Sequence, residues 1–388
     1  MIQKKINKYL LDHRCTLLGI GPMSLNCVDA TIELANEHLV PLILIASRRQ
    51  IDSEDFNGGY VNKWTTSEFA DHVRKEDKSG NIILARDHGG PWQNDLESLK
   101  KMNLKEAMNS AKVSYKADID AGFQVLHIDP SIDIHGAPTI EQSLDRLFEL
   151  YEYCWSYAQK KGQEVIFEVG TEEQSGTNNT LEELDYNLSS IKKFCNKNNF
   201  PLPTFVVVQT GTKVMETRNV GSFDSPLRIE GELPAEIQVP KMIEICSKHN
   251  IFMKEHNTDY LSDVALSWHP RLGIHSANVA PEFGVAETRA FIKLMEENNL
   301  KSFASKFLEL SYNSGKWKKW IIPNSSINDR EKSIIAGHYI FSMEEFIDLK
   351  KEVYQNLKNK IGIELDVYLK DQVKKSILRY LYNFRLVR

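Results

Sequence analysis

The chain has 388 residues, of which 41% are hydrophobic, so it can form one large α/β domain or two ordinary domains with a sizeable core. Its formal net charge of −5 excludes the basic surface typical of proteins that bind nucleic acid or anionic membranes. The five cysteines are scattered without a CxxC pair, and no apolar run approaches the roughly 20 residues that span a bilayer. We therefore expect a reduced, cytoplasmic protein.

Short apolar runs typical of buried strands alternate with longer amphipathic stretches. The runs expected to form strands lie at 16–21, 41–47, 82–88, 125–130, 164–172, 204–211, 251–256 and 272–278. The helical patterns between them lie at 26–37, from 66, at 96–120, from 139, and at 181–196, 241–249 and 286–297. Residues from about 300 to 388 carry no strand signal and place Lys, Leu, Tyr and Phe at helical spacing.

This alternation predicts a (β/α)8 TIM barrel, an architecture of typically about 250 residues. A doubly wound open sheet is the alternative, but no GxGxxG follows the first strand, which counts against a dinucleotide-binding sheet. We predict a TIM barrel over 1–299 and a helical C-terminal extension over 300–388. The extension is expected to pack on the barrel or to form an oligomer contact, without a catalytic role.

In such a barrel the residues just after each strand face one cavity. These positions hold histidines and carboxylates from several strands, and no cysteine. Nitrogen and oxygen ligands suit a divalent metal with an open coordination position, and zinc is the first expectation. A single histidine on a strand is more often a hydrogen-bonded core group than a ligand. His88 and His256 are favoured as ligands because each follows an acidic residue at the end of an apolar strand.

Three arginines lie close to the same strand ends. Arg48 and Arg49 follow the second strand, and Arg86 lies beside Asp87. Guanidinium groups suit the recognition of phosphate or carboxylate. The alternative is that these arginines neutralise neighbouring carboxylates in a charged rim.

Several short motifs occur in a fixed order along the chain. They lie at 57–60 (Asn-Gly-Gly-Tyr), 82–93 (with Asp-His-Gly-Gly-Pro-Trp-Gln), 121–129, 170–172, 206–209 and 256–260 (His-Asn-Thr-Asp-Tyr). Taken together they resemble the class II D-tagatose-1,6-bisphosphate aldolase accessory subunits, the non-catalytic or Z-type subunit family. The resemblance covers nearly the whole chain and implies a barrel related to class II aldolases that acts on ketose phosphates.

The resemblance also implies roles for individual residues. His88 and His256 would be metal ligands, and Glu172 would be a third ligand or a carboxylate close to the metal. Asp87 would donate and accept the proton, so Asp87 and Glu172 are the expected catalytic residues. The residues expected to bind substrate are Arg48, Arg49, Arg86, His127, Asp129, Gln209, Asp259, His275 and Asn278.

The resulting hypothesis is a metal-dependent aldolase or 4-epimerase that acts on a phosphorylated ketose by retro-aldol chemistry. One alternative is a non-catalytic subunit that stabilises a separate class II aldolase subunit, and another is a sugar-phosphate isomerase without C–C cleavage. The expected partners are a phosphorylated ketose or related sugar phosphate, the aldolase subunit in the first alternative, and further copies of the chain in a homo-oligomer. The chain departs from the family pattern at 46–50, at 85–86 and at His275, so the sugar is left open.

Overall fold

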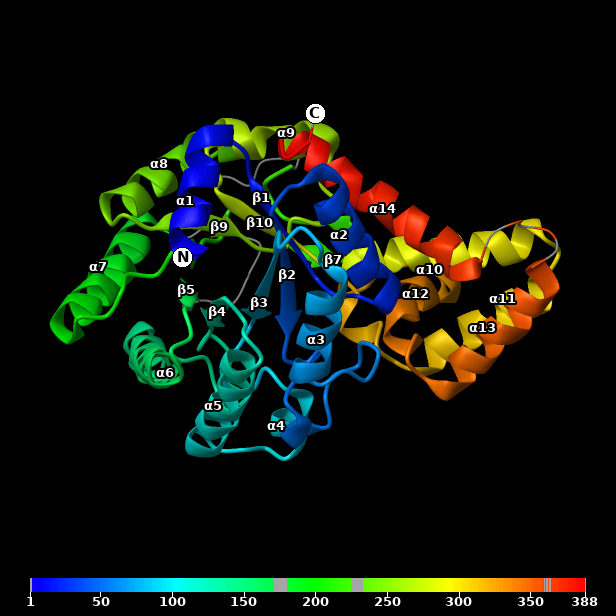
Figure 1. Ribbon diagram of the computed structural model, residues 1–388, viewed down its shortest axis with the longest axis horizontal. Coiled ribbons are helices and arrows are strands. Elements are labelled where there is room, and N and C mark those ends of the chain that lie inside the picture. The colour runs from blue at the N-terminus through cyan, green and yellow to red at the C-terminus, as the bar shows by residue number, and fades with distance from the viewer. Residues whose placement is uncertain are drawn as a thin grey trace.

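The computed structural model describes residues 2–170, 180–224, 233–358, 360, 362 and 364–387. Eight parallel strands close into a barrel in the order β1-β10-β9-β6-β5-β4-β3-β2, which confirms the predicted TIM barrel (Figure 1). The barrel strands are β1 (Leu17–Ile20), β2 (Leu42–Ser47), β3 (Ile82–Asp87), β4 (Val125–Ile128), β5 (Ile166–Val169), β6 (Phe205–Val207), β9 (Phe252–Glu255) and β10 (Ser276–Val279). The longest pairing joins β2 to β3, from Leu42 opposite Ile82 to Ser47 opposite Asp87.

Helices surround the barrel, and several begin at a capping signal in the sequence. They are α2 (Leu25–His38), α3 (Thr66–Glu76), α4 (Asp95–Leu99), α5 (Leu104–Asp120), α6 (Ile140–Lys161), α7 (Leu181–Asn198), α8 (Ala235–Lys248), α9 (Asp263–Leu272) and α10 (Pro281–Glu297), with η1 at Glu54–Phe56. Capping boxes, in which a side chain at each end of the first turn satisfies a backbone N–H, start α3, α5, α6 and α7. A further helix, α1 (Ile2–His13), precedes β1.

The C-terminal extension is helical, as predicted. It contains α11 (Lys301–Asn313), η2 (Lys318–Trp320), α12 (Asp329–Ala336), η3 (Gly337–Ile340), α13 (Glu344–Leu357) and α14 (Leu365–Asn383). In Figure 1, α11 to α13 project to one side of the barrel, and α14 returns along α2 and α10. The loop after β6 forms a small hairpin of β7 (Val214–Met215) and β8 (Arg218–Asn219).

Apolar residues form two clusters. One fills the barrel and its helices, and it includes Val373, Ile377 and Leu381 of α14. The other joins α10 to the extension around Phe307 and Phe346. The last helix therefore packs as part of the barrel, although it lies about 90 residues beyond the last barrel strand. Among the described helices, none has the length and apolar character needed to cross a membrane.

Candidate metal centre and active site

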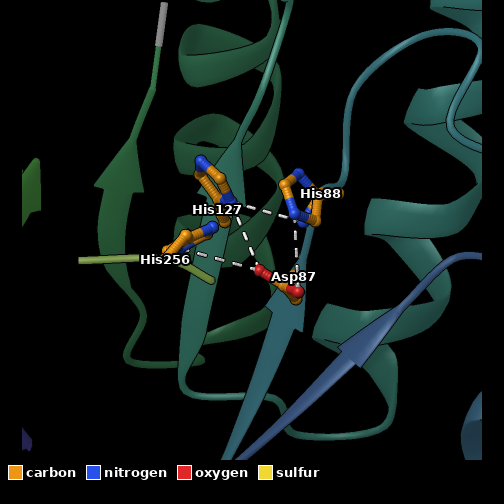
Figure 2. Close-up of side chains that lie close together, drawn as sticks. All are labelled: Asp87, His88, His127 and His256. Carbon is orange, nitrogen blue, oxygen red and sulfur yellow. Dashed lines mark hydrogen bonds and ion pairs between the residues drawn. The ribbon is translucent and has the colours of Figure 1, made fainter. Parts of the chain in front are cut away.

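Four side chains with metal-ligand chemistry meet at the mouth of the barrel. Asp87 ends β3, His88 follows it, His127 lies on β4 and His256 follows β9. Each offers one ligand atom, and these atoms all lie within 4.8 Å of one another (Figure 2). The centroids of the three imidazole rings are 5.2 to 5.5 Å apart. Closure of the barrel thus brings together residues that are far apart in the sequence.

A tight turn after β3 directs His88 into this cluster. β3 is buried along its whole length, and His88 then takes the left-handed conformation with a φ of 47°. This conformation is uncommon for a residue with a side chain and is concentrated at functional sites. Gly89 N donates to the His127 carbonyl at 3.2 Å. A Cβ on Gly90 would lie only 1.6 Å from the Asp129 carbonyl oxygen, so the close approach of β3 and β4 requires glycine there.

Asp129 fixes the orientation of His88. Its Oδ2 lies 2.6 Å from His88 Nδ1 and accepts a hydrogen bond from Gln93 Nε2 at 2.9 Å. Its Oδ1 accepts from the backbone N–H and the hydroxyl of Ser131. A proton on His88 Nδ1 therefore points at Asp129, and His88 Nε2 faces Asp87 Oδ2 at 3.7 Å. A carboxylate behind the ring is the usual way of holding a metal-ligand histidine in one tautomer.

Glu168 and Lys254 form a buried ion pair next to His256. Lys254 Nζ lies 2.6 Å from Glu168 Oε2, and Glu168 Oε1 lies 2.9 Å from His256 Nε2. Neither residue is among those predicted for the site, because Glu168 and Lys254 lie within β5 and β9 and do not follow the strands. A charged residue inside an apolar buried strand was the available signal, since such a group needs a partner across the barrel.

Burial and opposite charges set the ionisation of the cluster. Burial opposes a charge on Asp87, but His88 and then the other two imidazoles lower the Asp87 pKa well below its ordinary value. Burial also disfavours a charge on His88, yet Asp87 and Asp129 raise the His88 pKa to about 9. Burial lowers the pKa of His256. At neutral pH and without a metal, the cluster therefore contains an ionised Asp87 beside a protonated His88 and a neutral His256. A bound cation would displace the extra proton from His88, because a metal-ligand imidazole is neutral.

The donor set fits a divalent transition-metal ion. Asp87 Oδ1 lies 3.7 Å from His127 Nδ1 and 3.8 Å from His256 Nε2. Ligand atoms of a tetrahedral ion with bonds of about 2.0–2.1 Å lie roughly 3.3–3.5 Å apart, so small shifts would bring these atoms onto one ion. His127 Nδ1 accepts from the His88 backbone N–H at 3.3 Å, so this nitrogen carries a lone pair and would exchange that hydrogen bond for the ion. Three imidazoles form the protein ligand set of some catalytic zinc sites, so the histidines can hold an ion with the Asp87 carboxylate beside it.

Two cavities adjoin the cluster. One has a volume of about 210 Å³ and extends toward the C-terminal extension, and the other, of about 200 Å³, lies on the β4 and β5 side. Arg49, His88, His256 and Asn257 line both cavities. Small-molecule sites are commonly about 300–1,000 Å³, so the two cavities together suit a ligand of sugar-phosphate size.

Residues 3–194, about half of the chain, match the family described as D-tagatose-1,6-bisphosphate aldolase subunit GatZ/KbaZ-like. The chain belongs to this family. The matched residues include Asp87, His88, His127 and Asp129, so over 3–194 the family match confirms the resemblance drawn from the ordered motifs. The comparison with curated protein sequences gives no match.

Solved structures share the fold of this GatZ/KbaZ-like protein at low sequence identity. A probable tagatose 6 phosphate kinase from Sinorhizobium meliloti is 16% identical, with a TM-score of 0.66 over 95% of this chain and 100% of the other. The fructuronate-tagaturonate epimerase UxaE from Cohnella laeviribosi is 11% identical, with a TM-score of 0.59 over 95% and 81%. A fructose-bisphosphate aldolase from Campylobacter jejuni is 13% identical, with a TM-score of 0.55 over 99% and 94%. At these identities the likeness concerns the fold.

The three arginines expected to hold substrate fall into two groups. Arg48 and Arg86 are fully buried and lie outside both cavities. Arg48 Nη1 lies 2.6 Å from a Glu97 carboxylate oxygen, and Arg86 Nη2 lies 2.5 Å from Asp118 Oδ1. Because side chains alternate along a strand, Arg86 points toward the helices when its neighbour Asp87 points into the barrel. Arg49 is partly exposed and lines both cavities.

Two of the other expected substrate residues line the larger cavity. Asp259 does so, and its Oδ1 also accepts from the backbone N–H groups of Ala280 and Glu282 at 3.0 and 2.9 Å, at the start of α10. Asn278 lies on β10, with Nδ2 3.0 Å from His256 Nε2. These positions place both side chains within the site, and Asp259 also stabilises the first turn of α10.

Two expected residues lie elsewhere, and a third is not described. His275 precedes β10, and its Nδ1 accepts from the Met253 backbone N–H at 3.2 Å near the start of β9. It therefore lies at the opposite end of the strands from the cluster. Gln209 is buried after β6 and is not among the residues that line the two cavities. Glu172 lies outside the described residues.

Proposed function

We propose that this chain is a metal-dependent aldolase or 4-epimerase that acts on a phosphorylated ketose by retro-aldol chemistry. The observation that carries the proposal is the meeting of three imidazoles and the Asp87 carboxylate, from three barrel strands, beside cavities of suitable size. His88, His127 and His256 would hold the ion. When bound, a divalent metal supplies Lewis-acid polarisation of a ketose carbonyl.

Asp87 would move the proton of the reaction. Its pKa is held low, so at neutral pH the carboxylate can accept the proton of the C4 hydroxyl as the C3–C4 bond breaks. The electron pair of that bond stays with C3, and C4 leaves as an aldehyde. In the reverse direction C3 attacks the aldehyde, and Asp87 returns its proton to the C4 oxygen. Addition to the opposite face of the aldehyde would give the C4 epimer. Arg49, at the wall of both cavities, would bind an anionic group of the ketose.

Metal analysis and a turnover assay test this proposal. We expect purified protein to carry close to one equivalent of a divalent transition metal, measured by inductively coupled plasma mass spectrometry. Retro-aldol turnover of a panel of ketose mono- and bisphosphates should be abolished by a chelator and restored by added Zn²⁺, Mn²⁺ or Co²⁺. A His256→Asn variant should lose the metal, whereas His13→Asn, on the exposed face of α1, should keep it. Protein without metal and without metal-stimulated turnover contradicts the proposal.

The accessory role is the second candidate function. It is favoured by the family description, which names an aldolase subunit. In this role the chain would show no turnover alone but would raise the activity or stability of a co-expressed class II aldolase subunit. Co-expression of the two chains, followed by size-exclusion chromatography and assay of each fraction, distinguishes the candidates. Turnover by the isolated chain that is lost in Asp87→Asn would contradict a purely accessory role.

A further inference from the structure

The C-terminal extension forms part of the wall of the 210 Å³ cavity. Lys319 and Trp320 come from η2, and Tyr339 comes from η3. They line this cavity together with Arg49 and His88. Residues far beyond the last barrel strand therefore face the same space as the metal-ligand cluster.

The Lys319 ammonium is held between aromatic rings and has no ion-pair partner in the described part of the chain. Its Nζ lies 4.8 Å from the centroid of the Trp320 ring and 5.4 Å from that of Tyr339. Such faces attract a cation but leave its N–H donors available. Lys319 is solvent-accessible, yet the surrounding protein and the Arg49 guanidinium lower its pKa to about 8. An added anion would reverse this effect and favour the charged form.

The charges around this cavity wall are unbalanced. Arg49 Nε lies 2.6 Å from Asp95 Oδ1, and Lys316 Nζ lies 3.5 Å from Asp95 Oδ2. With Lys319, three cations thus share one carboxylate on the extension side of the cavity, which leaves two positive charges there. The carboxylates of Asp87 and Asp259 line the barrel side. A phosphate monoester carries about −1.5 to −2 charges at neutral pH, whereas a carboxylate carries one. The excess charge therefore matches phosphate better than carboxylate.

Hydrogen bonds hold the η2 turn in place without a ligand. The Trp320 carbonyl accepts from the Glu216 backbone N–H at 2.7 Å, and Trp320 Nε1 donates to the Tyr339 hydroxyl at 3.1 Å. Glu216 belongs to the hairpin loop after β6, so the turn is attached to the barrel as well as to the extension. A cation on such a turn is positioned before the ligand arrives, which reduces the entropic cost of binding.

We propose that Lys319 and Arg49 form the subsite for the phosphate at the non-reacting end of the substrate. This inference rests on the proposed function for the identity of the ketose, but the subsite itself can be measured with inorganic phosphate. It assigns to the extension a part in substrate selection, in addition to its packing role.

The test compares two neighbouring lysines. Lys319→Met removes the proposed contact, and Lys318→Met makes the same charge change on an exposed residue of η2 that does not line the cavity. Isothermal titration calorimetry with inorganic phosphate should show a dissociation constant raised about 10- to 100-fold in Lys319→Met, the range for one charge-assisted hydrogen bond. Lys318→Met should stay within about twofold, since an exposed charge contributes little. Lys319→Arg should retain most of the affinity.

Kinetics separate this inference from the proposed function. With a phosphorylated ketose, Lys319→Met should raise KM with little change in kcat, and the unphosphorylated sugar should show no such effect. Turnover with an unchanged KM in Lys319→Met overturns the subsite and leaves the proposed function standing. Phosphate binding that depends on Lys319 in a protein without turnover supports the subsite and overturns the proposed function. Equal phosphate affinity in Lys319→Met and Lys318→Met overturns the subsite whatever the activity.

Discussion

Replacement of Arg86 by methionine should destabilise the protein without a specific effect on substrate binding. Arg86 Nε and Nη2 lie 2.8 and 2.5 Å from the two Asp118 carboxylate oxygens, and Nη1 donates to the carbonyls of Ala46 and Ile51 at 2.8 and 2.7 Å. Both members of the ion pair are fully buried. Arg86→Met would leave one buried carboxylate and two buried carbonyls without their partners.

The loss can be worked out from these contacts. Removing one partner of a buried ion pair costs about 3–5 kcal/mol, and each unpaired carbonyl adds about 1–3 kcal/mol before the structure relaxes. We expect the free energy of unfolding to fall by roughly 5 kcal/mol, a large part of the about 5–15 kcal/mol typical of folded proteins. Burial raises the pKa of Asp118 although the Arg86 charge lowers it. In Arg86→Met the Asp118 pKa stays raised above its unfolded value, so the free energy of unfolding of the variant should fall further as pH rises.

Urea unfolding followed by far-UV circular dichroism, at pH 5 and pH 8, measures this loss. The double variant Arg86→Met/Asp118→Leu should recover most of the stability, because replacing both charges with apolar groups removes the unpaired carboxylate. Where Arg86→Met stays folded, its KM for a phosphorylated ketose should equal that of the wild type. A variant within about 1 kcal/mol of wild-type stability that shows a raised KM would refute the structural assignment of Arg86.

Three further changes test the site and its surroundings. Asp87→Asn should keep the metal but lower turnover about 100- to 10,000-fold, because it removes the proton acceptor. Loss of the metal in this variant would instead show that Asp87 is a ligand. Gly90→Ala should weaken metal binding in a chelator-competition assay, since the new Cβ would meet the Asp129 carbonyl and displace the turn that carries His88. Burial lowers the pKa of His338 to about 3. An imidazole with a lowered pKa stabilises the fold only while it is neutral. The free energy of unfolding should therefore fall as pH drops below about 6.5, by up to about 1.4 kcal/mol per pH unit. In urea unfolding, His338→Phe should show a shallower dependence on pH.

The barrel could be predicted from the sequence because its periodicity is local. Each strand is a short apolar run, and the starts of α3 and α6 carry the capping residues Thr65 and Thr139. The Asp87-His88 pair ends such a run, and barrel topology requires residues at strand ends to meet. The direction of the Arg86 side chain also follows from a local pattern, because it is opposite to that of its strand neighbour Asp87, so it could have been predicted from the sequence.

The other features of the site depend on strand boundaries and on contacts between distant segments. His275 was expected to bind substrate from a strand at 272–278, but β10 begins only at Ser276, so the histidine precedes the strand and lies at the other end of the barrel. The Glu168–Lys254 pair and the position of Lys319 at the cavity wall result from tertiary packing, which no local pattern encodes.

The end of α14 is hydrogen-bonded to the segment that precedes β1. The Thr16 backbone N–H, just before β1, donates to the carbonyl of Phe384 at 3.1 Å, and α14 supplies apolar side chains to the same core. A growing chain on the ribosome therefore exposes the apolar faces of α2 and α10 until α14 has been translated. A chain truncated before α14 would leave these apolar faces uncovered, and exposed apolar surface of this kind promotes aggregation and misfolding.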